Sequence, residues 1–499
     1  MHRRRTLIQR ALTLSSRDLG GRVLRGASFQ ALGMVARIVI TIGSTAILAR
    51  LLSPADYGRV AMASVVTELA ALFANFGLAN ILIQRQRISR LDIDTVFWAT
   101  AGLGVALAAV VFALSFPAGL WYGDPVVGDL LRFMGLSFVL NGLTVVPWVV
   151  LVRLMRFRTD FWIQMVTLVV RAGVAIACAL AGLGVWSLVV GALAAPLFQA
   201  AIGLVVVGYR PRWRFRTGLI TGTWRTSGSY FGGSLLYFTS MSIDLVLIGR
   251  QLGATALGHY QNARTLTDEI RARIAMPLQQ VLFPAFASVQ GEPERAREMV
   301  LRSGRILAAV VVPVGIGIAA MAAELVPVLY GPQWGEMVPL LAMLGVGAAL
   351  RASTAISQPI IYAHDRVARS LRYHAVQAAL IVGAVLLAMP HGITAVTAAI
   401  LVVTLYALVP YRFALSLLGL GWRHVWQMLG PPFVASLAFW ALLLLAARWG
   451  AGAGWPAAVN LLWKAALSGA VYLALMPLLA RIYIDDVRYL LAKVRPKRA

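Results

Sequence analysis

The sequence is poor in the residues that disulfides, metal sites and nucleotide-binding loops require. Its single cysteine, Cys178, lies inside an apolar run, so neither a disulfide framework nor a cysteine-based metal site is expected. Lysine occurs only at Lys464, Lys493 and Lys497, and there is no G-x-x-x-x-G-K-S/T loop. The motifs H-E-x-x-H and C-x-x-C are also missing. Pumping by ATP hydrolysis within this chain is therefore not expected.

Charged residues are scarce as well, at 13%, whereas hydrophobic residues make up 60% and the mean hydropathy is +0.79. A soluble domain of 499 residues does not have this composition, but a membrane protein with many spans does. We predict an all-α polytopic integral membrane protein with about 14 transmembrane helices, each long enough to cross the bilayer core. The predicted spans are 26–52, 57–83, 92–117, 128–152, 160–181, 184–207, 229–251, 260–287, 304–329, 335–361, 371–389, 392–411, 424–447 and 457–480.

The net charge of +26 is explained by where the arginines lie. They cluster at 1–25, in every second loop and in the tail 481–499, as the positive-inside rule requires of cytoplasmic segments. The segment 1–25 is too polar to span and does not read as a cleavable signal peptide. Both termini are therefore predicted to be cytoplasmic.

The loops on the opposite side are short, which excludes several functions. None is longer than roughly a dozen residues, so no extracytoplasmic domain is expected. The largest inner segments, 208–228 and 288–303, are too short for an ATPase or glycosyltransferase domain. His364, His374 and His391 lie near span ends and are interpreted as ordinary loop or interface histidines.

The sequence of a hairpin near the N-terminus is partly repeated 200 residues later. Arg50, Leu52 and Gly58 correspond to Arg250, Leu252 and Gly258, and further matches with the same offset are Gly33 with Gly233, Leu78 with Leu278, Leu82 with Leu282, and Glu68 with Asp268. Transporters are often built from such repeats, although chance similarity between two apolar hairpins is the alternative.

The repeat predicts two pseudo-symmetric six-helix lobes around a central cavity, with two accessory C-terminal helices. The predicted parts are a cytoplasmic basic segment 1–25, an N-lobe 26–207, a basic linker 208–228, a C-lobe 229–411, accessory spans within 424–480 and a basic tail 481–499.

Polar residues inside the spans are the candidates for function, because charges in a membrane are costly and usually face a bundle interior. The arginine excess favours an anion that carries phosphates or hydroxyls, because a guanidinium presents a fork of donors suited to phosphate. The predicted substrate-binding residues are Arg37, Arg171, Arg271, Arg273, Arg351, Gln30, Asn75 and Tyr237. The predicted ion-coupling residues are Asp244, Glu68 and Asp268.

Structural roles for the same charges are the alternatives. Arg264 with Asp268, and Glu269 with Arg273, are i,i+4 pairs that would neutralise one another on one helix. In addition, Arg37 and Glu68 are on neighbouring spans and would be able to pair, Arg351 would snorkel if it lay near the interface, and Asp244 would accept hydrogen bonds from Ser or Thr neighbours.

The stretch GASFQALGMVARIVITIGSTAILARLLSPADYGRVAMASVV, with the turn LARLLSPADYG at 48–58, resembles the start of the Wzx-type oligosaccharide flippases. Phe76-Gly77-Leu78 and the echo at Leu252–Tyr260 are also similar to that family, closest to its colanic acid exporter branch, within the multidrug/oligosaccharidyl-lipid/polysaccharide (MOP) superfamily. The resemblance implies alternating access that carries a polyprenyl-diphosphate-linked oligosaccharide from the cytoplasmic to the periplasmic leaflet of the inner membrane. It also implies that cationic residues such as Arg37, Arg171 and Arg271 receive the diphosphate and acidic sugars.

The expected function is thus a flippase for exopolysaccharide, capsule or O-antigen assembly, and not an enzyme. No cofactor is expected other than a coupling H+ or Na+, and no nucleic acid. The expected partners are the lipid-linked oligosaccharide, membrane lipids, and polysaccharide polymerase and export machinery, with the last two spans as a candidate groove for the lipid tail. The alternatives are a multidrug or cation antiporter of the same superfamily and a polysaccharide polymerase or ligase.

Overall fold

The computed structural model describes residues 36–74, 79, 82–83, 85, 88–277, 292–448 and 454–479. In these ranges the chain is helical, with no strand. The chain divides into two compact units, Met1–Gly258 and His259–Ala499, and each is described by itself.

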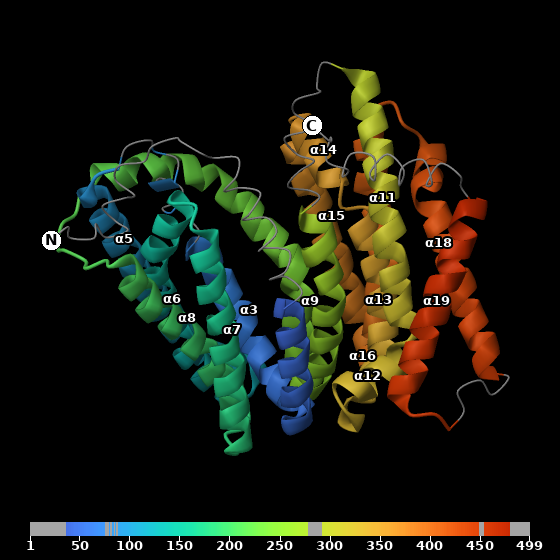
Figure 1. The fold of residues 1–499 in the computed structure, drawn as a ribbon, viewed down its shortest axis with the longest axis horizontal. Coiled ribbons are helices and arrows are strands. Elements are labelled where there is room, and N and C mark those ends of the chain that lie inside the picture. The colour runs from blue at the N-terminus through green and yellow to red at the C-terminus, as the bar shows by residue number, and fades with distance from the viewer. Residues whose placement is uncertain are drawn as a thin grey trace, which may run out of the picture. The chain divides into compact units, whose positions relative to one another are not determined.

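The first unit consists of long helices, and short turns join α5 to α6, α6 to α7 and α7 to α8 (Figure 1). Residues 36–51 are helical, and helix α9 continues beyond the unit boundary. Helices α5, α6, α7 and α8 pack on one another in sequence, and α3 packs on α5 and α6. The bounds are α3 Pro54–Ala74, α5 Arg90–Tyr122, α6 Pro125–Arg153, α7 Phe157–Leu180, α8 Trp186–Val207 and α9 Gly218–Ile270.

Local sequence signals set the ends of α5 and α6. Ser89 and Asp92 form a reciprocal capping box at the start of α5, which satisfies backbone N–H groups that the helix leaves unpaired. Gly123 ends α5 in the left-handed conformation, at φ 67°. Asp124 then caps α6, with Pro125 at its first position.

The turn within the motif at 48–58 is closed in the same way. The Ser53 backbone N–H and hydroxyl both donate to the Asp56 carboxylate, at 3.0 and 2.7 Å. Arg59, one position past the motif, donates to the carboxylate of Asp124 at 2.7 Å and so joins α3 to the start of α6. The polar residues of the motif therefore fix the turn, and Arg59 next to the motif links α3 to α6.

The two repeat motifs pack against each other at equivalent positions within the first unit. A Cβ added at Gly58 would lie 1.7 Å from the carbonyl oxygen of Ala254, and one added at Gly258 would lie 1.9 Å from that of Pro54. Positions 54 and 254, like 58 and 258, differ by 200, so the contact is reciprocal. Helix α9 is also interrupted at Gly253, with φ 80°, at the position equivalent to the break at residue 53. Equivalent positions of the two predicted repeats therefore meet each other.

The second unit holds the remaining helices, with α11 packed on α13 and α18, and α18 on α19 (Figure 1). It begins with the end of α9 and a π-helical turn η1, Arg271–Ala275. The other bounds are α11 Pro293–Ala320, α12 Ala322–Leu329, η2 Pro332–Trp334, α13 Met337–Ser353, α14 Ser357–Ala363, α15 Val367–Ala388, η3 Met389–His391, α16 Gly392–Thr404, η4 Leu405–Ala407, α17 Leu408–Ser416, α18 Trp422–Arg448 and α19 Ala457–Leu479.

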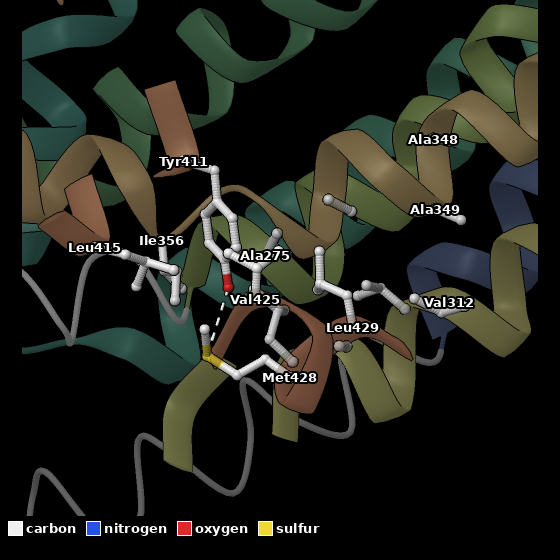
Figure 2. Close-up of a cluster of buried hydrophobic side chains, with 14 of the residues drawn as sticks. Ala275, Val312, Ala348, Ala349, Ile356, Tyr411, Leu415, Val425, Met428 and Leu429 are labelled. Carbon is white, nitrogen blue, oxygen red and sulfur yellow. Dashed lines mark hydrogen bonds between the residues drawn. The ribbon is translucent and has the colours of Figure 1, made fainter. Parts of the chain in front are cut away.

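The core of the second unit is a cluster of buried side chains from α11, α13, α17 and α18 (Figure 2). Tyr411 is completely buried there, and its hydroxyl donates to the Met428 sulfur at 3.5 Å. Leu415, Val425 and Leu429 surround this pair, as Figure 2 shows. The cluster joins α18 to the body of the unit, so α18 belongs to the packed core.

The predicted fold class is confirmed, because ten helical stretches in the described ranges are long and apolar enough to cross a membrane. One of the ten, Val367–Ser416, contains two of the fourteen predicted spans. The ten therefore account for all predicted spans except 26–52, of which 36–51 is described, 229–251, which lies within α9, and 260–287, of which α9 and η1 contain 260–275.

Replacing Gly58 by alanine should destabilise the protein. The added methyl group would meet backbone atoms of Ala254, which cannot rotate away as a side chain can. Overpacking of this kind costs about 1–3 kcal/mol, so the thermal midpoint of the purified protein should fall by several degrees. Gly258→Ala should cause a similar loss.

Gly43→Ala is the matched control, because a Cβ at that helical position meets no atom within 4 Å. It should leave the midpoint unchanged or raise it. Equal midpoints for the three variants would contradict the reciprocal contact.

Candidate functional site

In the first unit, Arg37 begins a chain of polar side chains between two helices. Its guanidinium donates to the side-chain oxygen of Gln164 on α7 at 2.9 Å. The amide of Gln164 in turn donates to the carboxylate of Asp160 at 3.1 Å, one turn earlier. A guanidinium, an amide and a carboxylate thus lie in a row, and the helix at 36–51 is joined to α7 through them.

In the second unit, two arginines converge on one carboxylate. Arg264 lies 3.4 Å from Asp268, one helical turn away on α9, and Arg351 of α13 lies 4.0 Å from it. Arg351 also donates to the hydroxyl of Thr404, at the end of α16, at 3.4 Å. The Asp268 side chain is 48% exposed, so an accessible carboxylate lies between two guanidinium groups. The two guanidinium groups are suited to an anion that would compete with Asp268 for them.

A second ion pair follows on the same helix, where Arg273 contacts Glu269. Both i,i+4 pairs considered from the sequence, Arg264 with Asp268 and Glu269 with Arg273, are therefore present. Local neutralisation accounts for Arg273, but Asp268 is shared with α13 and so also has a tertiary role.

The other predicted residues are placed less closely together. In the first unit, Arg171 of α7 and Glu68 of α3 are exposed, while Asp244 on α9 is buried, with 6% of its surface exposed, and Tyr237 is half-buried. Of the predicted set, Arg351 and Asp268 interact with each other. Gln30, Asn75 and the Arg271 side chain lie outside what the structure describes, although the backbone of Arg271 begins the π-helical turn.

The sequence interpretation missed a buried ion pair between α12 and α19. The ammonium of Lys464 contacts the Glu324 carboxylate, and both side chains are 13% exposed. The second oxygen of Glu324 is buried and has no hydrogen-bond partner in the described part of the chain. The signal was available, because these are an isolated acid and an isolated lysine inside two predicted spans.

The segment that follows α8 is tied to the start of α5. Residues 209–216 are bonded to the first turns of α5. The Tyr209 hydroxyl donates to Asp94 at 2.7 Å, and Trp98 donates to the carbonyl of Arg212 at 2.9 Å. Burial, and then the hydrogen bond to Asp94, raise the pKa of Tyr209 well above its usual value. Since backbone carbonyls and Tyr209 make these bonds, the arginines of this segment remain exposed as a basic surface.

Breaking the pair at α12 and α19 should strongly destabilise the second unit. Lys464→Met would leave the Glu324 carboxylate buried without its cation, which typically costs about 3–5 kcal/mol. Glu324→Met should have a similar effect, and the thermal midpoint of each purified variant would report it.

The double variant Glu324→Met/Lys464→Met supplies the control. Because both charges are removed together, it should recover most of the stability that either single change loses. Additive losses in the double variant would show that the two side chains do not depend on each other.

Comparison with known proteins agrees with this architecture. The family model described as "Polysaccharide biosynthesis protein" matches residues 47–339, more than half of the chain, beginning at the motif at 48–58. The lipopolysaccharide biosynthesis protein WzxC of Escherichia coli is 26% identical over 432 residues, covering 84% of this chain and 86% of that protein. The succinoglycan biosynthesis transport protein ExoT of Rhizobium meliloti is 28% identical over 328 residues, covering 66% of each chain.

Solved structures show the same fold. The lipid II flippase MurJ, in an inward closed conformation, superposes with a TM-score of 0.73 at 11% identity, over 92% of this chain and all of that one. An inward-facing multidrug resistance MATE transporter of the MOP superfamily superposes with a TM-score of 0.59 at 16% identity, over 77% of this chain and 94% of that one. The resemblance seen in the sequence is thereby confirmed: this chain belongs to the polysaccharide biosynthesis protein family of multi-span membrane proteins.

Proposed function

We propose that this protein is a flippase that moves polyprenyl-diphosphate-linked oligosaccharide repeat units from the cytoplasmic to the periplasmic leaflet. The product would be used for exopolysaccharide, capsule or O-antigen assembly. The observation that carries the proposal is the family match over residues 47–339, together with similarity over most of the chain to WzxC. The name of ExoT, a succinoglycan biosynthesis transport protein, supports transport and not catalysis.

The charges inside the helices support an anionic substrate. Arg351 and Arg264 share one accessible carboxylate, and Arg37 is held by the neutral amide of Gln164. A diphosphate offers guanidinium groups stronger and more numerous acceptor oxygens than a single carboxylate does. The second candidate function is a cation antiporter, which the structural similarity to a MATE transporter suggests. Such an antiporter would favour a net acidic site instead.

The distribution of arginine supports an inner-membrane orientation with both termini in the cytoplasm. The exposed arginines of 209–216 lie between α8 and α9, on the side that the positive-inside rule assigns to the cytoplasm. The sugar head group would enter from this side while the lipid tail stays in the bilayer. Polysaccharide polymerase and export proteins would then receive the unit on the outer face.

Coupling to an ion gradient is part of the same proposal. Asp244 is the strongest of the three predicted carboxylates, because it is buried on α9, whereas Glu68 is exposed and Asp268 is held by two arginines. Acidic residues inside membrane helices are rare and costly, and they commonly mark ion pathways. Asp244→Asn should therefore remove the dependence of flipping on the ion gradient.

The proposed activity is tested by locating lipid-linked sugars in a deletion strain. Polyprenyl-diphosphate oligosaccharides should build up on the cytoplasmic face, protected from a membrane-impermeant lectin or from periodate, and surface polymer should be lost. Completed units that reach the outer face without being polymerised would instead indicate a polymerase or ligase. An unchanged glycan profile would direct attention to the antiporter.

Site variants test the role of the cationic clusters. Arg351→Gln should lower the rate of flipping about tenfold or more, since a hydrogen bond to a charged group contributes about 1.5–3 kcal/mol. Asp268→Asn should keep or improve substrate affinity, because it removes the competing carboxylate. Arg37→Ala and Arg271→Ala should also reduce polymer export.

Arg132→Gln is the control, because Arg132 pairs with Asp129 near the start of α6 and belongs to neither cluster. It should transport at the normal rate. If Arg351→Gln behaved like this control at equal expression, the cluster around Asp268 would have no part in substrate binding.

A further inference from the structure

A cavity of about 860 Å³ lies within the second unit, between the start of α11 and the turn that leads into α18. Four arginines, two glutamates and His424 line it, together with a short apolar floor. The arginines are Arg295, Arg297, Arg302 and Arg305. The lining therefore has a net positive charge in a chain whose predicted site residues are all elsewhere.

Arg297 and Arg302 make different kinds of contact. Arg297 donates to the carbonyl of Leu418 and to Glu294, both at 2.6 Å, and a Cβ on Gly419 would lie 2.7 Å from its guanidinium. It therefore shapes the turn. Arg302 lies 3.5 Å from Glu298, whose side chain is 67% exposed, so an incoming anion is able to replace that long contact.

His424 adds a neutral donor to the wall of the cavity. Its Nδ1 accepts the backbone N–H of Gly421 at 3.1 Å, and this bond requires Nδ1 to be unprotonated. The proton of the neutral ring is then on Nε2, which leaves a donor on the other side of the imidazole. A donor beside several guanidinium groups favours a ligand that has many acceptor oxygens.

The cavity lies where the helices change from polar to apolar. Arg305 is followed on α11 by an uncharged run as far as Ala320, and Leu420, on the cavity floor, belongs to the buried cluster of Figure 2. Trp422 and Trp426, on either side of His424, are 59% and 66% exposed. Exposed tryptophans at a span end are typical of the membrane interface, where lipid phosphates lie.

From this arrangement we propose that the cavity binds the phosphate of a lipid headgroup. The lipid is a phospholipid of the bilayer or a polyprenyl diphosphate, since both carry the same chemistry at this depth. Bound phosphate would accept from Arg302, Arg295 and the His424 Nε2–H group. It would displace Glu298 from Arg302, and also Glu292, which accepts from Arg295 at 2.7 Å and is exposed. The lining of the site includes no residue of the cluster at Asp268. Binding of a bilayer phospholipid is independent of the proposed transport, whereas binding of a polyprenyl diphosphate rests on the proposed function.

The test is a binding measurement on the purified full-length protein after removal of lipid. The probes are dioleoyl phosphatidylglycerol, the matching dioleoylglycerol without phosphate, a polyprenyl diphosphate and inorganic pyrophosphate. Arg295→Gln/Arg302→Gln should weaken binding of a phosphate-bearing lipid at least tenfold and leave dioleoylglycerol unaffected. Arg423→Gln removes one charge next to His424, outside the cavity lining, and should change affinity less than twofold.

The probes separate the two sources. Weakened binding of phosphatidylglycerol would identify bilayer phospholipid, and weakened binding of polyprenyl diphosphate alone would identify the lipid carrier. The proposal is overturned if neither lipid loses affinity beyond the Arg423→Gln control, or if only pyrophosphate responds. Flipping is measured in the same variants as binding. If a variant loses lipid binding but flips normally, or loses flipping but binds lipid normally, the two activities are separable. Failure of this site is then distinguished from failure of the proposed transport.

Glu298→Gln provides a test that damage to the fold cannot imitate. Because it removes the carboxylate that competes for Arg302, it should tighten binding of the responding lipid severalfold. Unchanged or weaker binding in this variant would contradict an anion site at Arg302, whatever the double arginine variant does.

Discussion

The reciprocal approach of Gly58 to Ala254 and of Gly258 to Pro54 is the constraint on which the first unit depends. Backbone atoms meet there, so no side chain can adjust if a Cβ is added. The contact holds the start of α3 against the break in α9 at Gly253. The surrounding polar residues, Ser53 and Asp56, are used to cap the turn, so the most recognisable motif of the sequence is a packing device and not a ligand site.

Charges within the membrane helices are compensated in two physically different ways. Lys464 and Glu324 are equally buried and in direct contact, which suits a permanent link between α19 and α12, since separating them would leave a charge in a medium of low dielectric. Arg351 and Asp268 are 4.0 Å apart, and the carboxylate is half exposed. Little is lost when such a pair opens, so this contact is easily exchanged for one to a ligand.

The sequence predicts the features that depend on residues close together in the chain, but not those that depend on distant residues. The helices, their approximate ends and the i,i+4 pairs of α9 are set by residues within one or two turns, and composition alone is enough to predict them. The equivalence of Gly58 and Gly258 was visible as a repeat, but not that the two glycines meet. The partnership of Arg37 with Gln164 joins residues 127 positions apart, and no local pattern indicates which polar group an arginine will meet.

The cluster at Asp268 and the cavity at Arg302 share one feature: each allows one anion to be exchanged for another. In each, a guanidinium rests on an exposed carboxylate at 3.4 Å or more, and the same helix supplies the neutralising acid one turn away. Without a ligand, the carboxylate limits the cost of keeping an arginine near the apolar region. With a phosphate present, the guanidinium gains additional charge-assisted hydrogen bonds while the acid returns to water, because its side chain is already largely exposed. A chain rich in arginine and poor in lysine is suited to this exchange, because only arginine offers two parallel donors to either partner.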